Sequence, residues 1–106
     1  MSHYSGIAGR RVLVTGATSG LGLAMAQALL QEGAKVAIGG RDQGKIDRVV
    51  ASLGSAAGEC VGALINVREE QSIETGVAAL VRLWGGIDVL INNAGIGMRT
   101  VNPGSL

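Results

Sequence analysis

Hydrophobic residues recur along the chain in two alternating patterns. Four short, nearly continuous apolar runs occupy residues 11–15, 35–39, 60–65 and 89–91. Such runs are typical of strands that are buried on both faces of a parallel sheet. Between the runs, apolar residues return at spacings of three and four, which predicts amphipathic helices. The pattern therefore predicts three helices that alternate with four strands.

The same spacing predicts which face each helix buries. The first helix begins at Leu21 and should end at Gly33, which suits the left-handed residue after a helix. The second follows Asp42, a residue suited to an N-cap, and the third begins near Glu69 or Glu70. Ala24 and Ala28 are small, so the first helix could lie close to the sheet. The expected buried faces are Leu21, Ala24, Met25, Ala28 and Leu29, then Ile46, Val49, Val50 and Leu53, then Ile73, Val77, Leu80, Val81 and Trp84.

Alternation of strands and helices with right-handed crossovers predicts an α/β fold with helices on both faces of the sheet. We expect a partial, Rossmann-type doubly wound parallel sheet of four strands in the order 3-2-1-4, with three helices. At 106 residues, the chain is expected to be one domain or part of one. We predict irregular structure for residues 1–9 and 98–106.

Composition and charge exclude several classes of function. Nine basic and eight acidic residues give no electrostatic reason to expect nucleic acid or an anionic membrane as a partner. Cys60 is the only cysteine, so an internal disulfide and a cysteine metal cluster are excluded, and we expect no metal site. No apolar stretch reaches transmembrane length, and residues 1–10 lack the apolar centre of a signal peptide. We expect a cytoplasmic protein.

The candidate chemistry begins at residues 15–22, Thr-Gly-Ala-Thr-Ser-Gly-Leu-Gly, between the first strand and the first helix. Its three glycines allow a tight turn and a close approach of the backbone to a ligand. The first N–H groups of a helix lack partners in the helix and carry a partial positive charge. A strand, a glycine-rich turn and a helix N-terminus thus predict a site for a pyrophosphate. The alternative is a glycine-rich turn without a ligand.

A second motif makes the first one specific. Residues 92–95 read Asn-Asn-Ala-Gly and follow Gly-Ile-Asp-Val-Leu-Ile at 86–91. With the turn at 15–22, these motifs make residues 10–97 resemble the short-chain dehydrogenase/reductase family. The resemblance implies an oxidoreductase that transfers a hydride between a nicotinamide dinucleotide and a carbonyl or alcohol substrate. The chain would represent the N-terminal, cofactor-binding half of such an enzyme.

The resemblance also implies roles for individual residues. The pyrophosphate and ribose would be lined by Gly16, Thr18, Ser19, Gly20 and Leu21, and the nicotinamide ribose by Asn92, Ala94 and Gly95. Asn66 and Val67 would lie beside the adenine, although the family usually has an aspartate where this chain has Asn66. Two structural alternatives stay open: Asn92 and Asn93 could satisfy neighbouring backbone groups, and Asn66 could cap the next helix.

The end of the second strand predicts which dinucleotide fits. An acidic residue there would repel a 2′-phosphate, but this chain has Gly39, Gly40 and Arg41, with the acid delayed to Asp42. Small glycines would leave room, and a guanidinium suits a phosphate. We therefore expect NADP(H) to be preferred over NAD(H). Alternatively, Arg41 is only a solvated surface charge.

No catalytic residue can be assigned. The family uses a serine, a tyrosine and a lysine four residues after that tyrosine, whereas Tyr4 is the only tyrosine here and is followed by Ala8. We expect the 106-residue chain to be inactive alone. The alternatives to an enzyme are a non-catalytic dinucleotide-binding module and an inactive truncated remnant. The fourth strand would be left as an open edge, through which the chain could self-associate.

Overall fold

The computed structural model describes residues 6–54 and 58–93, in which the predicted alternation of strands and helices is present. Residues 1–5 and 98–106, which we predict to be irregular, lie outside the described residues. Each observed strand differs from its predicted range by no more than one residue. In order, the elements are β1 Arg11–Thr15, α1 Gly20–Gln31, β2 Lys35–Gly40, α2 Gln43–Leu53, β3 Cys60–Leu64, α3 Glu70–Trp84 and β4 Val89–Asn92.

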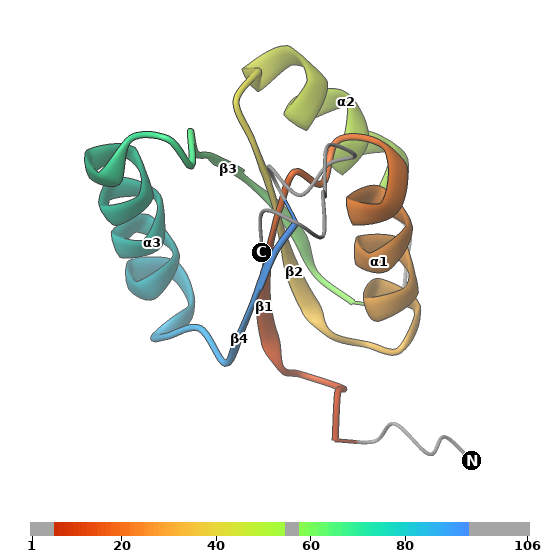
Figure 1. Cartoon of the computed structure of the whole chain (residues 1–106). Helices are drawn as coiled ribbons and strands as arrows, with labels where there is room; N and C mark the ends of the chain where they lie inside the picture. Colours follow the sequence, from red (N-terminus) through yellow and green to blue (C-terminus); the bar gives the residue numbers. More distant parts are fainter. Residues whose placement is uncertain (1–5, 55–57, 94–106) are drawn as a thin grey trace, which may run out of the picture.

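The strands form one parallel sheet in the predicted order β3-β2-β1-β4. In the centre of the sheet, Val12 of β1 is in register with Val36 of β2 and Val89 of β4. Helices α1 and α2 cover one face of the sheet and α3 covers the other (Figure 1). All strands point the same way, so the loops that follow β1, β2 and β3 lie at the same end of the sheet as Asn93 after β4, the end where such folds bind ligands.

The core has two sides because successive strand residues point to opposite faces. On the side of α1 and α2, the strands contribute Val12, Val14, Val36 and Ile38. On the side of α3, they contribute Leu13, Ala37 and Ala63, which pack with Ile65 and Leu80. Both faces of β1 and β2 are therefore buried, as their continuous apolar runs predict, whereas the edge strands β3 and β4 do not follow this expectation and have exposed residues such as Leu64 and Leu90.

The predicted buried face of α1 is wrong at three of its five positions, whereas Met25 and Leu29 are half-buried and pack against the core as expected. Leu21 is 67% exposed, and Ala24 and Ala28 are also exposed. The buried residues are instead Gly22, Ala26 and Leu30. The helix lies so close to the turn before it that a Cβ atom on Gly22 would be 2.2 Å from the Gly16 carbonyl oxygen. The smallest residue, rather than the most apolar one, therefore faces the turn at this point.

The predictions for the other two helices hold with one exception. Asp42 caps α2, since its carboxylate accepts a hydrogen bond from the Lys45 amide at 3.1 Å. In α3 the predicted face is correct except for Val81, which is 43% exposed. Gly85, with φ +83°, ends the helix in a left-handed conformation, and its amide donates to the Val81 carbonyl at 2.7 Å.

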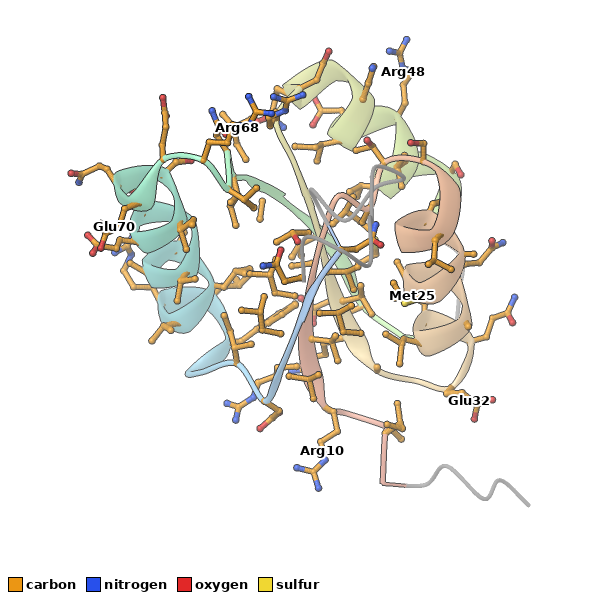
Figure 2. All side chains as sticks on the ribbon, viewed as in Figure 1. Arg10, Met25, Glu32, Arg48, Arg68 and Glu70 are labelled. Atoms are coloured by element: carbon orange, nitrogen blue, oxygen red, sulfur yellow. The ribbon has the colours of Figure 1, made fainter. Side chains whose placement is uncertain are left out.

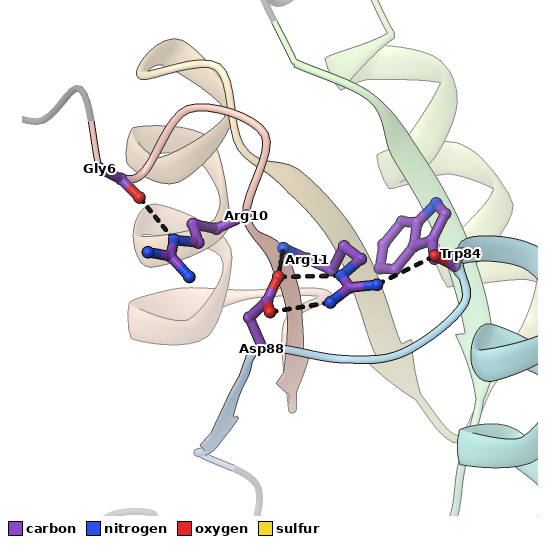
Figure 3. Close-up of polar contacts among 5 residues, drawn as sticks. All are labelled: Gly6, Arg10, Arg11, Trp84 and Asp88. Carbon is purple, nitrogen blue, oxygen red and sulfur yellow. Dashed lines mark hydrogen bonds and ion pairs between the residues drawn. The ribbon is translucent and has the colours of Figure 1, made fainter.

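At the opposite end of the sheet from the candidate site, an ion pair attaches β4 to β1. Arg11 donates two side-chain hydrogen bonds to Asp88, both at 2.9 Å, and a third at 3.2 Å to the Trp84 carbonyl (Figure 3). The Arg11 guanidinium holds the pKa of the Asp88 carboxyl well below its usual range. Beyond this contact β4 is an edge strand: within the described residues it pairs with β1 alone. Its Leu90 is 57% exposed.

Candidate cofactor site

The turn between β1 and α1 has the geometry of an anion site. Gly16 and Gly20 have positive φ angles, +63° and +60°, and no atom comes within 4 Å of where a Cβ on Gly20 would be. The first hydrogen bond of α1 runs from the Leu23 amide to the Ser19 carbonyl at 3.3 Å, so the N–H groups before it have no acceptor in the helix. The first turn of α1 contains no acidic residue that would repel an anion.

The predicted residues of this turn are exposed to different degrees. Ser19, Gly20 and Leu21 are exposed at the start of α1, whereas Gly16 and Thr18 are half-buried beneath them. The Ala17 amide donates to the Gly39 carbonyl at 3.0 Å, which joins the turn to the end of β2. The exposed residues that could contact a phosphate therefore follow a half-buried part of the turn that is hydrogen-bonded to β2.

The glycines at the end of β2 do not leave room, contrary to the sequence-based expectation. A Cβ on Gly40 would lie 3.0 Å from the Thr18 methyl group, and one on Gly39 would lie 3.0 Å from the Val14 carbonyl oxygen. The space is already filled, because the turn after β1 packs directly against β2. Arg41 follows these glycines and is exposed. Two further arginines, Arg48 and Arg68, lie at the same end of the molecule (Figure 2).

Asn66 lies at the same end, just after β3. The Ile65 amide donates to the Gly40 carbonyl at 2.7 Å, which brings Asn66 next to the end of β2. The Asn66 side-chain oxygen accepts from the Arg68 amide at 3.0 Å, but α3 begins later, with Glu69 at the N-cap position. Asn66 therefore organises the loop before α3 and is not the N-cap. Val67 beside it is half-buried.

Both asparagines at the end of β4 make structural contacts, but only Asn93 bonds a backbone group as the alternative interpretation expects, since Asn92 bonds a side chain. The Thr15 hydroxyl donates to the Asn92 side-chain oxygen at 2.9 Å, and the Asn93 side-chain nitrogen donates to the Gly16 carbonyl at 3.2 Å. These bonds join β4 to β1 and to the glycine-rich turn. Asn93 is the residue that the sequence-based assignment of the site missed. Ala94 and Gly95, the last two predicted site residues, lie outside the described residues.

A small apolar cavity opens on the α3 side of the same end. It holds about 90 Å³ and lies between the sheet and α3. Thr15 and Asn92, which hydrogen-bond to each other, are its polar lining residues. The apolar lining of the cavity is Leu13, Ile65, Val67, Ile73, Val77 and Leu90.

Within residues 6–54 and 58–93, no group of three or more histidine, cysteine, aspartate or glutamate side chains could hold a metal ion.

Comparison with known proteins identifies the class to which this architecture corresponds. The sequence model of the short chain dehydrogenase family matches residues 10–104. Gluconate 5-dehydrogenase of Gluconobacter oxydans (strain 621H) is 39% identical over 101 residues, which are 93% of this chain and 40% of that protein. The chain thus spans less than half the length of this relative.

Comparison with solved structures shows the same fold. The L-sorbose reductase of Gluconobacter frateurii, complexed with NADPH and L-sorbose, superimposes with a TM-score of 0.80 at 27% identity, over 89% of this chain and 36% of that one. The 3-ketoacyl-(acyl-carrier-protein) reductase of Brucella melitensis, complexed with NADH, gives a TM-score of 0.77 at 34% identity, over 94% of this chain and 40% of that one. The sheet that carries the candidate site thus has a counterpart in one structure complexed with NADPH and in one complexed with NADH.

Proposed function

Because the chain belongs to the short chain dehydrogenase family, we propose that the ends of its strands hold a nicotinamide dinucleotide for an oxidoreductase that acts on a carbonyl or alcohol. The observation that carries this proposal is the open start of α1, where N–H groups without helical partners stand beside the uncrowded Gly20. When bound, the cofactor would give or accept a hydride. Relatives named as dehydrogenases and reductases favour an enzyme over a binding module or an inactive remnant.

Each part of the dinucleotide has candidate contacts in this proposal. The Asn66 oxygen is used by the Arg68 amide, so its side-chain nitrogen is left to donate to the adenine, beside Val67. Asn92 is oriented in the same way, because its oxygen accepts from Thr15. Its nitrogen, with Ala94 and Gly95, would serve the nicotinamide ribose. The pyrophosphate and adjoining ribose would contact Gly16, Thr18, Ser19, Gly20 and Leu21.

Arg41 supports the preference for NADP(H) over NAD(H). It is exposed directly after the end of β2, and no carboxylate precedes it there. The solved structures that the chain resembles include NADPH and NADH complexes, so the preference depends on this guanidinium. A hydrogen bond to a charged group contributes about 1.5–3 kcal/mol. That range corresponds to a roughly ten- to hundredfold difference in affinity.

Titration of NADPH and NADH against the wild-type chain and Arg41→Ala tests this preference. We expect Arg41→Ala to weaken NADPH binding about ten- to hundredfold and to leave NADH binding unchanged. Arg48→Ala, which removes an exposed arginine from the same end of the molecule, is the matched control and should leave both affinities near those of the wild type. Equal affinities for the two cofactors in the wild type would contradict the preference.

We do not expect the 106-residue chain to catalyse turnover alone. Its single tyrosine, Tyr4, is not followed by a lysine four residues later, and the relatives extend well beyond the matched segment. Purified chain should bind NADPH weakly and oxidise none of it in the presence of small ketones. Steady oxidation above the rate without protein would overturn this expectation.

A cytoplasmic location remains part of the proposal. Within the described residues, no helix is long and apolar enough to cross a membrane.

The edge of β4 is the surface through which the chain would self-associate. Val89 and Leu90 are 39% and 57% exposed, and an unpaired strand edge offers free N–H and C=O groups. Size-exclusion chromatography should show oligomers that Leu90→Lys converts to monomer. A wild-type monomer with slow hydrogen exchange throughout β4 would overturn this proposal.

A further inference from the structure

Asn66, in the loop that follows β3, is held by three of its four polar groups. Its backbone amide donates to the Ser72 hydroxyl at 2.8 Å, and its carbonyl accepts from the Glu69 amide at 3.0 Å. Its side-chain oxygen accepts from the Arg68 amide at 3.0 Å. Asn66 is also half-buried, so its side chain has a fixed orientation. Within the described residues, its side-chain nitrogen alone makes no hydrogen bond.

The bond from Arg68 determines which end of the Asn66 amide faces outwards. A backbone N–H can donate to the oxygen of that amide but not to its nitrogen, which carries two hydrogens and is itself a donor. The oxygen must therefore face the Arg68 amide, and the NH₂ group must point away from it. An asparagine held in this way presents a donor to a ligand. An aspartate held by the same bond would present a second acceptor oxygen.

A second donor follows directly in the chain. The bond from the Glu69 amide to the Asn66 carbonyl closes a turn over residues 66–69, in which Val67 is the second residue. The backbone amide of Val67 makes no hydrogen bond within the part of the chain that the structure describes. Two consecutive residues, Asn66 and Val67, thus each offer one free N–H donor.

These two donors lie next to the strand end to which we assign the 2′-phosphate. The Ile65 amide donates to the Gly40 carbonyl at 2.7 Å, which joins the start of this loop to the end of β2. Arg41 follows Gly40 and is exposed. The 2′-phosphate is carried by the same ribose as the base. A nucleotide whose 2′-phosphate met Arg41 would therefore carry its base towards Asn66 and Val67.

Two neighbouring donors match one kind of purine better than the other. A 6-oxopurine, such as hypoxanthine or guanine, has two adjacent acceptors, the oxygen on C6 and the ring nitrogen N7. Adenine has an amino donor in place of that oxygen. Adenine can therefore accept from this pair only through a ring nitrogen. Its amino group, turned towards the Asn66 nitrogen, would set one donor against another.

We infer that Asn66 and Val67 form a base subsite of two donors, which binds a 6-oxopurine more tightly than the 6-aminopurine of NADPH. The inference rests on the proposed function, which supplies the dinucleotide. Asn66 is then the residue that determines the choice of base, because an aspartate in its place would reverse the outward group from donor to acceptor. NADPH is still bound, with its amino group unpaired.

The first experiment compares two ligands on the wild-type chain. NADPH and reduced nicotinamide hypoxanthine dinucleotide phosphate differ only in the base, so the contributions of the pyrophosphate, both riboses and the 2′-phosphate cancel in the ratio of their affinities. Fluorescence titration should show the hypoxanthine compound binding about fivefold more tightly, the gain expected from one additional hydrogen bond. Equal affinities, or tighter binding of NADPH, would overturn the inference.

The second experiment assigns the preference to Asn66. Asn66→Asp keeps an acceptor for the Arg68 amide, and we expect it to bind NADPH about fivefold more tightly than the hypoxanthine compound. Gln71→Glu, an exposed amide-to-acid change in the first turn of α3, is the matched control and should keep the wild-type order. General destabilisation would weaken both ligands alike and leave their ratio unchanged. A wild-type order in Asn66→Asp would overturn the role of Asn66.

A third comparison separates this inference from the proposed function. Inosine 2′-monophosphate and adenosine 2′-monophosphate carry the same two bases without the pyrophosphate, and the inosine compound should bind about fivefold more tightly. A chain that binds neither dinucleotide would overturn the proposed function, and the order of these two monophosphates would still decide the preference for the base. Absence of binding by all four ligands would overturn both proposals.

Discussion

Two glycines at the start of α1 are required for different physical reasons. Gly20 has φ +60° in open space, so the requirement is conformational. Gly22 belongs to the helix itself, but a Cβ there would meet the Gly16 carbonyl at 2.2 Å, so the requirement is one of space. Substitution by alanine distinguishes the two requirements.

Gly20→Ala should lower the free energy of unfolding by about 1 kcal/mol, the cost of a left-handed conformation for a residue with a side chain. Gly22→Ala should cost more, about 3 kcal/mol, because the atom that must move is backbone. Urea denaturation measures both. Gly6→Ala, at an exposed position where no atom lies within 4 Å of the added Cβ, should stay within about 0.5 kcal/mol of the wild type. A larger loss for Gly20→Ala than for Gly22→Ala would contradict this account.

At this scale the sequence predicts residue types better than contacts. The turn at 15–22 and the asparagines at 92–93 stand out in the sequence, because their spacing and position after strands are local properties. The bond from Asn93 to the Gly16 carbonyl joins atoms 77 residues apart. Its existence depends on how closely α1, the turn and β4 approach one another, which no local pattern contains.

Among the elements, α2 was predicted most accurately and α1 least. The residues of α2 outside its apolar face are mostly charged or polar, so one face alone can be buried. In α1, apolar residues occupy nearly every side, so a three-and-four spacing fits more than one face. The close approach to the Gly16 carbonyl selects the face with Gly22, and this selection depends on the tertiary structure.

The N-cap of α2 gives a test at the scale of one element. Asp42→Ala removes the acceptor of the Lys45 amide and should lower the free energy of unfolding by about 1 kcal/mol. Asp42→Asn retains a side-chain oxygen and should stay close to the wild type. Thermal unfolding followed by circular dichroism compares the two. Equal losses would mean that the charge of Asp42, rather than the hydrogen bond, stabilises the helix.

For the molecule as a whole, the strand order and both core faces follow from the sequence, whereas the attachment of β4 does not. The apolar run at 89–91 predicts a strand. It does not reveal that Arg11 and Asp88 join that strand to β1, because a charged residue at or next to the start of a strand is an ordinary pattern and does not indicate its partner. The ion pair joins the starts of β1 and β4 at the end of the sheet opposite to the candidate site (Figure 3).

This ion pair predicts an acid dependence of stability. Because the pKa of Asp88 is lowered in the folded chain, the stabilisation is fully present above the ordinary aspartate pKa of about 3.9 and is lost as the pH falls below it. Asp88→Asn should lower Tm at neutral pH and make Tm fall less steeply than that of the wild type below about pH 4. Parallel curves of Tm against pH for the two proteins would contradict the assignment.

The packing of Gly40 against Thr18 limits how coenzyme choice can be redesigned in this chain. An engineer who places a carboxylate at the end of β2 to favour NAD would push the new side chain into the Thr18 methyl group, 3.0 Å from its Cβ position. The same substitution would then disturb the turn that we propose binds the pyrophosphate of either coenzyme. A switch of specificity would therefore have to begin at Arg41, which is exposed.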